Sequence, residues 1–397
     1  MNKKPEVSVV VPAYNVEEYI GQCLKSILKQ TFENIEILCI DDGSRDRTVD
    51  IIREYMAKDG RIRLLEQEHQ YAGAARNAGI DASRGAYLLF WDADDFFEET
   101  AVEEMYREIR KEDSDICICN ARQYDTRTGT YKMPKYYLNK KYLPSQIPFS
   151  AETVPEYIFN ITTNVAWNKM YKKEFVEREG LRFETVQRAN DQFFVMLSLA
   201  KAKKIAATDE MLINYRINNS QSLTGGFSIS PLSSFETLMR IQEALKELKV
   251  WRKVEQSFVN KALNGMLYSL KIQTRIHGFI TLYNKMKTEG FAQLGITGRT
   301  PDYFYSEREY IRYKELMESR DGESYLLEQM RKGVMQNMQD DFENSTAYKI
   351  IRKMYRAVKK VRKKEWGEKR ASTDAKIKSE GKDISAALFG LRSMRRI

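Results

Sequence analysis

The 397-residue sequence has little cysteine, little histidine and no long apolar run. Its four cysteines are too few and too scattered for a disulfide framework, so we expect a reducing, cytoplasmic setting. The longest unbroken apolar run covers only residues 86–91, whereas a membrane-spanning helix needs roughly 18 such residues. Pro12, Asn15 and Glu17 follow the amino terminus too soon for a signal peptide. We therefore expect neither a membrane span nor a secretion signal.

The rare cysteines and histidines do not form a metal-binding pattern. Cys117 and Cys119 lie in an apolar run without a histidine near them, so we expect them to alternate with core residues on a strand. His69 follows a predicted strand, and we expect it in a surface loop. Two phosphate-binding patterns are also missing, because no G-x-G-x-x-G follows the first strand and no P-loop motif occurs. These absences argue against a Rossmann dehydrogenase and a P-loop enzyme.

The charge of the chain is concentrated at its carboxyl end. Residues 345–397 hold 17 Lys and Arg against 5 Asp and Glu, a net of +12, whereas residues 1–344 hold 48 against 51, a net of −3. Within 345–366 the apolar residues share one helical face and basic residues cover the rest, which predicts a basic amphipathic helix. Such a helix suits an anionic membrane surface, at the inner face of the cell membrane. Docking on the protein itself or on a partner subunit is the alternative, and the apolar stripe argues against nucleic acid.

The first ~120 residues alternate strand and helix patterns, which implies a parallel sheet with right-handed crossovers. Apolar runs predict strands at 7–11, 35–40, 62–65, 86–91 and 115–119, and helical spacing predicts helices at 20–28, 46–56, 72–82 and 99–111. Residues 125–165 read as irregular, and the pattern turns helical after about Gly226. We therefore expect an α/β domain over 1–225, a helical region over 226–344, and the amphipathic helix with a weakly ordered tail over 345–397.

Acidic residues follow two of the predicted strands, at Asp41–Ser44 and Asp92–Asp95. Open α/β sheets bind ligands at this edge. Three carboxylates within the second segment repel one another unless a cation or hydrogen-bond donors neutralise them, and oxygen ligands suit Mg²⁺ or Mn²⁺. The alternatives are an Asx turn at Asp41–Ser44 and a solvated acidic turn in which Asp95 caps the next helix.

The motifs in combination resemble the family 2 glycosyltransferases. They occur in order at Val7–Asn15, Asp41–Ser44, Gly73–Gly79 and Gly85–Asp95, and they continue at Trp167–Tyr171, Asn190–Phe194 and Tyr215–Arg216. The resemblance covers roughly residues 5–225. It implies the GT-A fold, a mainly parallel sheet flanked by helices, here with a helical C-terminal extension. It also implies inverting transfer of one sugar from a nucleotide donor, most simply a UDP-sugar, to a saccharide, polyol or lipid-linked glycan acceptor in surface polysaccharide synthesis.

The resemblance also implies which residues bind the donor. Pro12, Tyr14 and Asp42 match positions that hold the nucleotide base, with Asp42 accepting a hydrogen bond from the uracil N–H. Arg76 and Asp92 match positions near the nucleotide and the sugar.

The same resemblance implies a cation site and a catalytic base. Asp94 and Asp95 match the region where Mn²⁺ or Mg²⁺ bridges the diphosphate, and which of the two is the direct ligand stays open. Asp191 matches the base that takes the proton of the acceptor hydroxyl, and its alternative is an N-cap ahead of a helix over 192–199.

The sequence departs from the family pattern at three places. Asn190 stands where an acidic residue often precedes the base, no histidine follows Tyr215–Arg216, and the Q-x-x-R-W motif of processive synthases is missing. We therefore expect one sugar per encounter. The rival interpretations are a nucleotidyltransferase of similar fold and a non-catalytic membrane- or glycan-binding scaffold. The intact set of aspartates argues against the scaffold, and the sequence leaves open whether the chain forms a homo-oligomer.

Overall fold

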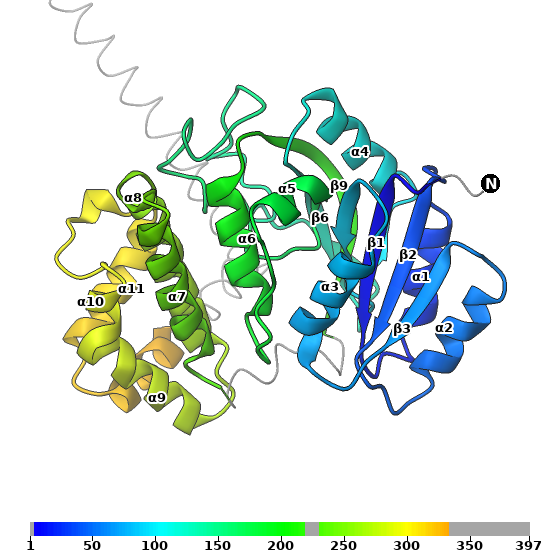
Figure 1. The fold of residues 1–397 in the computed structure, drawn as a ribbon. Coiled ribbons are helices and arrows are strands. Elements are labelled where there is room, and N and C mark those ends of the chain that lie inside the picture. Colours follow the sequence, from blue (N-terminus) through cyan, green and yellow to red (C-terminus); the bar gives the residue numbers. More distant parts are fainter. Residues whose placement is uncertain (1–3, 219–229, 333–397) are drawn as a thin grey trace, which may run out of the picture. The chain divides into compact units, whose positions relative to one another are not determined.

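Residues 4–218 and 230–332 are described by the computed structural model of the chain (Figure 1). Residues up to Gly322 belong to one compact unit, which carries every feature described below. The amphipathic helix predicted at 345–366 and the tail to 397 lie outside the described residues. Among the described residues, no helix is both long and apolar enough to cross a bilayer.

The described residues form a nine-stranded sheet, and its first four strands alternate with helices as the sequence predicts. Three parallel pairings give the order β3-β2-β1-β4. The strands are β1 (Val7–Ala13), β2 (Ile35–Asp41), β3 (Ile62–Glu66) and β4 (Tyr87–Phe90). The connecting helices are α1 (Ile20–Leu28), α2 (Thr48–Met56) and α3 (Tyr71–Ala82).

The rest of the sheet departs from the simple alternation. The strand predicted at 115–119 is longer, β6 (Ile116–Asp125), and it does not pair with β4, because the antiparallel β8 (Lys169–Lys172) lies between them. The long β9 (Ile205–Ile217), which the sequence did not predict, pairs in parallel with β6. Two short antiparallel strands complete the sheet: β5 (Phe96–Phe97) on β9 and β7 (Thr130–Lys132) on β6. The remaining helices of this part are α4 (Ala101–Lys111), α5 (Lys173–Arg178) and α6 (Asn190–Lys201).

Helices cover both faces of the central strands, which explains why β1 and β2 are apolar almost throughout. One face packs its alternate residues, such as Val9 and Val11, in one core cluster with residues of α1, α2 and α4. The other face packs on α3, where a Cβ at Gly79 would lie only 2.2 Å from Val10 Cγ1. Glycine at this position therefore permits the close approach of α3 to β1.

The chain continues into helices that pack beside α6 (Figure 1). They are α7 (Ser233–Glu247), α8 (Trp251–Lys271), α9 (Ile276–Lys285), α10 (Phe291–Gln293) and α11 (Glu307–Glu318), with a π-helix at Met286–Gly290 and a 3₁₀ turn at Pro301–Tyr303. An ion pair strengthens the junction, because Arg240 of α7 donates to both carboxylate oxygens of Glu184, just ahead of α6.

Candidate active site

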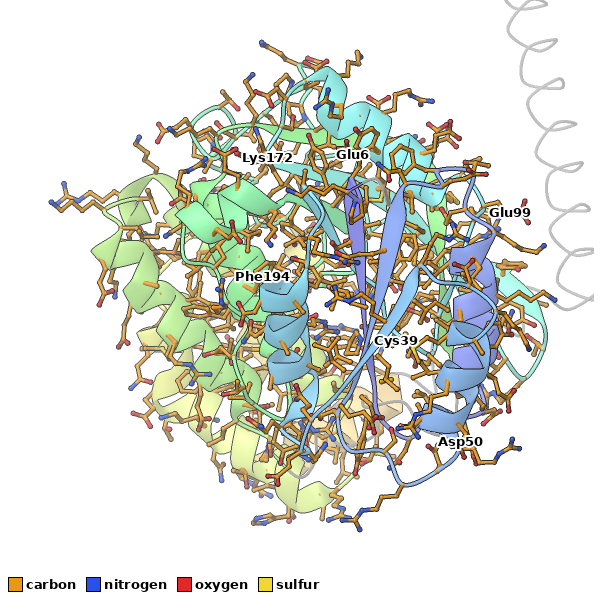
Figure 2. The ribbon with its side chains drawn as sticks, turned by 45° about the vertical axis from the view of Figure 1, so that its right-hand side comes forward. Glu6, Cys39, Asp50, Glu99, Lys172 and Phe194 are labelled. Atoms are coloured by element: carbon orange, nitrogen blue, oxygen red, sulfur yellow. The ribbon has the colours of Figure 1, made fainter. Side chains whose placement is uncertain are left out.

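The predicted site residues meet at the carboxyl ends of the parallel strands. Figure 2 shows Glu6, ahead of β1, at one end of the strands and Asp50, in the first turn of α2, at the other, which is the end of the site. A cavity of about 570 Å³ opens there, between the loops after β1, β2 and β4 and the start of α6. Seven of the eight predicted site residues line it: Pro12, Tyr14, Asp42, Arg76, Asp92, Asp94 and Asp191. The eighth, Asp95, is fully buried.

One end of the cavity combines a carboxylate with stacked rings. Asp42 Oδ1 accepts hydrogen bonds from Gln67 Nε2 at 2.7 Å and from the Gln70 amide at 2.8 Å. His69 Nδ1 lies 3.1 Å from the Asp42 main-chain oxygen and 2.8 Å from Oδ2. Both neighbours of Nδ1 are acceptors, so the proton must reside on this nitrogen. This proton is directed to the Asp42 main-chain oxygen. Among the described residues, Asp42 Oδ2 therefore receives no hydrogen bond of good geometry. Asp42 thus keeps one acceptor for a ligand N–H.

The His69 ring also stacks on Tyr14, with ring centroids 4.2 Å apart. The expectation that His69 is a surface loop residue is confirmed, since it lies between β3 and α3 with a side chain that is 39% exposed, and its ring also lines the cavity as part of an aromatic wall. The Asx-turn alternative for Asp41–Ser44 holds for Asp41 only, whose Oδ2 accepts from the amides of Gly43 and Ser44 at 3.1 Å. Asp41 shapes the turn, and this turn places Asp42 at the cavity.

Arg76 connects three segments in the middle of the cavity. Its Nη2 donates to Asp92 Oδ1 at 2.6 Å, and its Nη1 donates to Asn190 Oδ1 at 2.7 Å. Its side chain is 7% exposed, so both charge-assisted bonds are shielded from water. The pair of bonds fixes α3, the loop after β4 and the start of α6 relative to one another. Asn190, the departure from the family pattern, therefore has a structural partner in Arg76.

The Asp92, Asp94 and Asp95 carboxylates form a cluster that fits a divalent cation. One oxygen from each lies within 4.8 Å of the others. Asp95 Oδ1 accepts from the Arg216 amide at 2.7 Å, whereas its buried Oδ2 has no hydrogen-bond partner among the described residues. Burial, together with the neighbouring Asp94 and Asp92, raises the pKa of Asp95 well above its usual range. A bound cation would remove both costs, since it coordinates the orphaned oxygen and offsets the like charges.

The alternative of a solvated acidic turn at Asp92–Asp95 is wrong. Asp95 is wholly buried, and α4 begins only at Ala101, so Asp95 does not cap that helix. Its partner is instead β9, through Arg216, whose Nε also donates to the Asp94 main-chain oxygen at 2.6 Å. The cluster is thus held in place by β9, the strand that pairs with β5 directly after Asp95.

Asp191 lines the same cavity as Asp42 and lies in the first turn of α6. The helix begins at Asn190 with Ala189 as its N-cap, so Asp191 is inside the helix, and the N-cap alternative is wrong. Burial raises the pKa of Asp191 from 3.8 to about 6, although Arg76 opposes this shift. A carboxylate with such a pKa is ionised at neutral pH and still basic enough to accept a proton. Its position at the cavity wall suits a general base.

Backbone strain gathers around the same cavity. The positive φ angles of Asn15 (49°), Tyr71 (70°) and Ala189 (57°) place non-glycine residues in the left-handed region, and all three residues line the cavity. Such conformations cost of order 1–3 kcal/mol each and persist where the surrounding structure enforces them. Their clustering supports a functional cavity over a packing defect.

The motif at Trp167–Tyr171 supports one wall from behind. Trp167 is buried and stacks on Tyr215, which lines the cavity; the ring centroids are 5.3 Å apart. Lys169 is wholly buried, and its Nζ donates to the main-chain oxygens of Thr163 and Val165 at 3.0 and 2.7 Å. The lysine thus ties down the loop that leads into Trp167, and the motif is structural. The four cysteines, including Cys117 and Cys119, are buried and free.

Sequence reasoning missed four residues that build the cavity or its cation cluster. Three of them, His69, Arg188 and Tyr71, lie in loops or at a helix start, where no periodic pattern marks them. Arg216 belongs to β9, and its contact with the aspartates joins residues more than 120 positions apart. The only local signal was the Tyr215–Arg216 pair, which the motif comparison noted without assigning a role.

Comparison with known proteins agrees with this geometry. The family model described as glycosyl transferase family 2 matches residues 8–180. EpsH of Bacillus subtilis is 31% identical over 302 residues, which is 73% of this chain and 80% of EpsH. The glycosyltransferase GlyG of Streptococcus pneumoniae is 30% identical over 229 residues, 56% of this chain and 75% of GlyG.

Solved structures show the same fold. A crystal structure of S. aureus TarS in complex with UDP-GlcNAc superposes with a TM-score of 0.61 at 20% identity, and the match covers 79% of this chain and 91% of that chain. The mixed sheet, parallel over β3-β2-β1-β4, has with its flanking helices the GT-A fold that the resemblance of the motifs implies. With this fold and the EpsH match over most of both proteins, the chain belongs to the family 2 glycosyltransferases.

Proposed function

We propose that the chain transfers one sugar from a UDP-sugar to a saccharide, polyol or lipid-linked glycan acceptor, with inversion and with Mn²⁺ or Mg²⁺. One observation carries the proposal. A single cavity combines Asp42 and the stacked rings beside it, the carboxylate cluster at Asp92–Asp95, and Asp191 with its raised pKa. These are the three parts that a donor base, its diphosphate and an acceptor hydroxyl each require. The proposed domain organisation is 1–225 for catalysis, 226–344 as a helical region and 345–397 as a basic tail.

The uracil base is the best match for the Asp42 end. The N3–H of uracil is a donor, and Asp42 Oδ2 is an acceptor without a hydrogen-bond partner among the described residues. Tyr14 is 42% exposed, although its ring already stacks on His69, so its free face can accept a base. Support also comes from TarS, a protein of similar fold that was crystallised with UDP-GlcNAc.

The diphosphate would lie at the carboxylate cluster. Asp94 and Asp95 would hold the cation, and Asp95 Oδ2, which has no hydrogen-bond partner among the described residues, fits this role. A bound Mn²⁺ or Mg²⁺ supplies positive charge that stabilises the departing diphosphate. Arg76 orients Asp92 at the edge of the cluster, toward the position expected for the donor sugar.

Asp191 would act as the base. As the acceptor oxygen forms its bond to the anomeric carbon, its proton passes to the Asp191 carboxylate, and the bond from that carbon to the diphosphate oxygen breaks. A single displacement of this kind inverts the anomeric centre. Positioned bases contribute typically ~10²–10⁴-fold to such a reaction.

UDP release from a panel of UDP-sugars tests the proposal. We expect release that requires Mn²⁺ or Mg²⁺ and is lost in Asp95→Ala, whereas Asp81→Ala, an exposed carboxylate on α3, keeps the wild-type rate. Release of pyrophosphate in place of UDP would identify a nucleotidyltransferase. No release from any donor, with UDP binding also absent, would contradict the proposed function.

We further propose that residues 345–366 bind an anionic membrane surface, which would bring the enzyme to a lipid-linked acceptor at the inner face of the cell membrane. The support is the sequence pattern of an apolar stripe among basic residues. Flotation with phosphatidylglycerol vesicles compares the full chain with a chain that ends at Asn344. Equal binding of the two would contradict the proposal.

A further inference from the structure

A second cavity, of about 510 Å³, lies next to the proposed donor cavity. One wall comes from the segment just before α6, and the opposite wall comes from the start of α7 and from Thr281 of α9. Its volume falls in the roughly 300–1,000 Å³ range of ligand pockets. The cavity therefore exists only because the helices after the sheet pack beside α6.

The two cavities share a wall. Gln187 and Arg188 line both of them, and Asp191, which lines the donor cavity, follows Arg188 by three residues. Arg188 is 7% exposed, and burial lowers the pKa of its guanidinium, so a charged group stands desolvated between the two spaces. The wall that the two cavities share is thus three residues along the chain from the proposed base.

The lining of the second cavity combines apolar side chains, among them Val186, Pro231 and Leu232, with polar ones, and it is close to neutral in charge. Ser233, Thr237 and Thr281 contribute hydroxyls, and Gln187 contributes an amide. Arg240 is paired with Glu184 through both carboxylate oxygens, and the second carboxylate of the lining, Glu236, also interacts with the charge of Arg240. This mixture of donors and acceptors without net charge matches a ligand with many hydroxyl groups better than a strongly charged one.

We propose that the second cavity is the acceptor subsite, and that it takes a polyhydroxylated acceptor, a saccharide or a polyol, whose reacting hydroxyl lies at Asp191. The proposal rests on the proposed function and assigns a role to α7 and α9. The acceptor oxygen forms the new bond to the anomeric carbon, its proton goes to Asp191, and the electron pair of the broken bond leaves with UDP. The helical region thus contributes directly to acceptor choice.

A cavity-filling variant of the full chain tests the proposal. Thr281→Trp places a large ring in the second cavity, whereas Asn284→Trp on the exposed side of the same helix is the matched control. The probes are glucose, galactose, N-acetylglucosamine, lactose, ribitol and glycerol, each added with UDP-GlcNAc or UDP-glucose and Mn²⁺. We expect at least one probe to stimulate UDP release by the wild type and by Asn284→Trp. In Thr281→Trp the KM for that probe should rise at least tenfold, while the calorimetric Kd for UDP stays within twofold.

The outcomes separate this proposal from the proposed function. A wild type that neither binds UDP nor releases it contradicts the proposed function itself. Normal acceptor stimulation in both Thr281→Trp and Ser233→Trp, with UDP binding intact, overturns the acceptor subsite alone. A wild type that binds UDP but responds to none of the six probes overturns the polyhydroxylated class. If Thr281→Trp misfolds by circular dichroism, Ser233→Trp, at the start of α7 in the same wall, decides.

Discussion

Asp191 meets two opposed requirements in one side chain. Its burial raises the pKa to about 6, which makes the carboxylate a better base, but the same burial makes its ionised form costly. The folded chain holds this proton more tightly than the unfolded chain does. The associated stability is therefore complete below about pH 4 and is lost as the pH rises through about 6.

The variant Asp191→Asn should separate these two effects. We expect transfer to fall at least 10²-fold, while the free energy of unfolding at pH 7.5 rises by about 1–3 kcal/mol, because the amide carries no charge to desolvate. Thermal melts at pH 7.5 and at pH 4 check the sign, since the gain should disappear at pH 4. In the wild type, kcat/KM should fall tenfold per pH unit below about 6. Undiminished transfer by the variant would refute the role of Asp191 as base.

Asp42→Asn should alter the choice of base. The amide oxygen of the asparagine can replace Oδ1 as acceptor from Gln67 and Gln70. The new NH₂ donor then takes the position of Oδ2, which is the proposed acceptor for the uracil N–H. We expect the Kd for UDP to rise about 10- to 100-fold, the size of a lost hydrogen bond to a charged group. The Kd for CDP should fall, because cytosine N3 is an acceptor. Calorimetric titration of both nucleotides checks this, and an unchanged UDP-to-CDP ratio would contradict the role of Asp42.

At the residue scale, the sequence predicted the aspartates but not their surroundings. Asp42, Asp92, Asp94 and Asp95 stand in motifs of recognisable spacing after apolar strands. A lone histidine has no such context, and His69 acquires its place only because Tyr14, more than fifty residues earlier, folds against it. Contacts of this kind are set by tertiary packing, which local spacing does not encode.

At the element scale, the close packing of α3 on β1 depends on the absence of a side chain at Gly79. The Cβ of an alanine at position 79 would lie 2.2 Å from Val10 Cγ1, so Gly79→Ala forces the helix or the strand to move. We expect a loss of about 1–3 kcal/mol of unfolding free energy, as for overpacked cores. Gly265→Ala in α8 is the matched control, because its Cβ meets no atom within 4 Å. The free energy of unfolding of this control variant should rise by up to about 1 kcal/mol, because alanine is favoured over glycine inside a helix.

Urea unfolding of the two glycine variants measures the difference. UDP affinity should also weaken in Gly79→Ala, since Arg76 lies one turn earlier on the same helix and carries the bond to Asp92. Equal stability of Gly79→Ala and Gly265→Ala would contradict the packing argument.

The elements that the sequence predicted are those with an unbroken local pattern. β1 and β2 are apolar runs interrupted only by single polar residues such as Ser8 and Glu36, and α1 between them shows clear apolar spacing. β9 was missed because Asp209 and Glu210 stand in its middle, exposed, where its pairing with β6 shifts register. The insertion of β8 between β4 and β6 was also invisible, since strand order is decided by long-range pairing.

At the scale of the whole molecule, the carboxylate cluster couples ligand binding to stability. A cation held by Asp94 and Asp95, as proposed, would relieve the like charges at the buried Asp95 and would attract the diphosphate, so Mn²⁺ and UDP together should stabilise the chain more than the sum of the two alone. At a hundredfold excess over the Kd we expect about 2.7 kcal/mol. Thermal melts with and without EDTA check this. The extra gain should vanish in Asp94→Asn and persist in Asp81→Asn, and an equal gain in both variants would contradict the cation site.

The bond between the Arg216 amide and Asp95 Oδ1 joins positions 121 residues apart. During synthesis on the ribosome, every aspartate of the cluster and the base on α6 emerge before β9 does. Until then Asp95 lacks the amide that holds it, and the wall at Tyr215 does not exist. We therefore expect a nascent or prematurely terminated chain that stops short of β9 to be catalytically silent, although it already contains all the carboxylates proposed for the reaction.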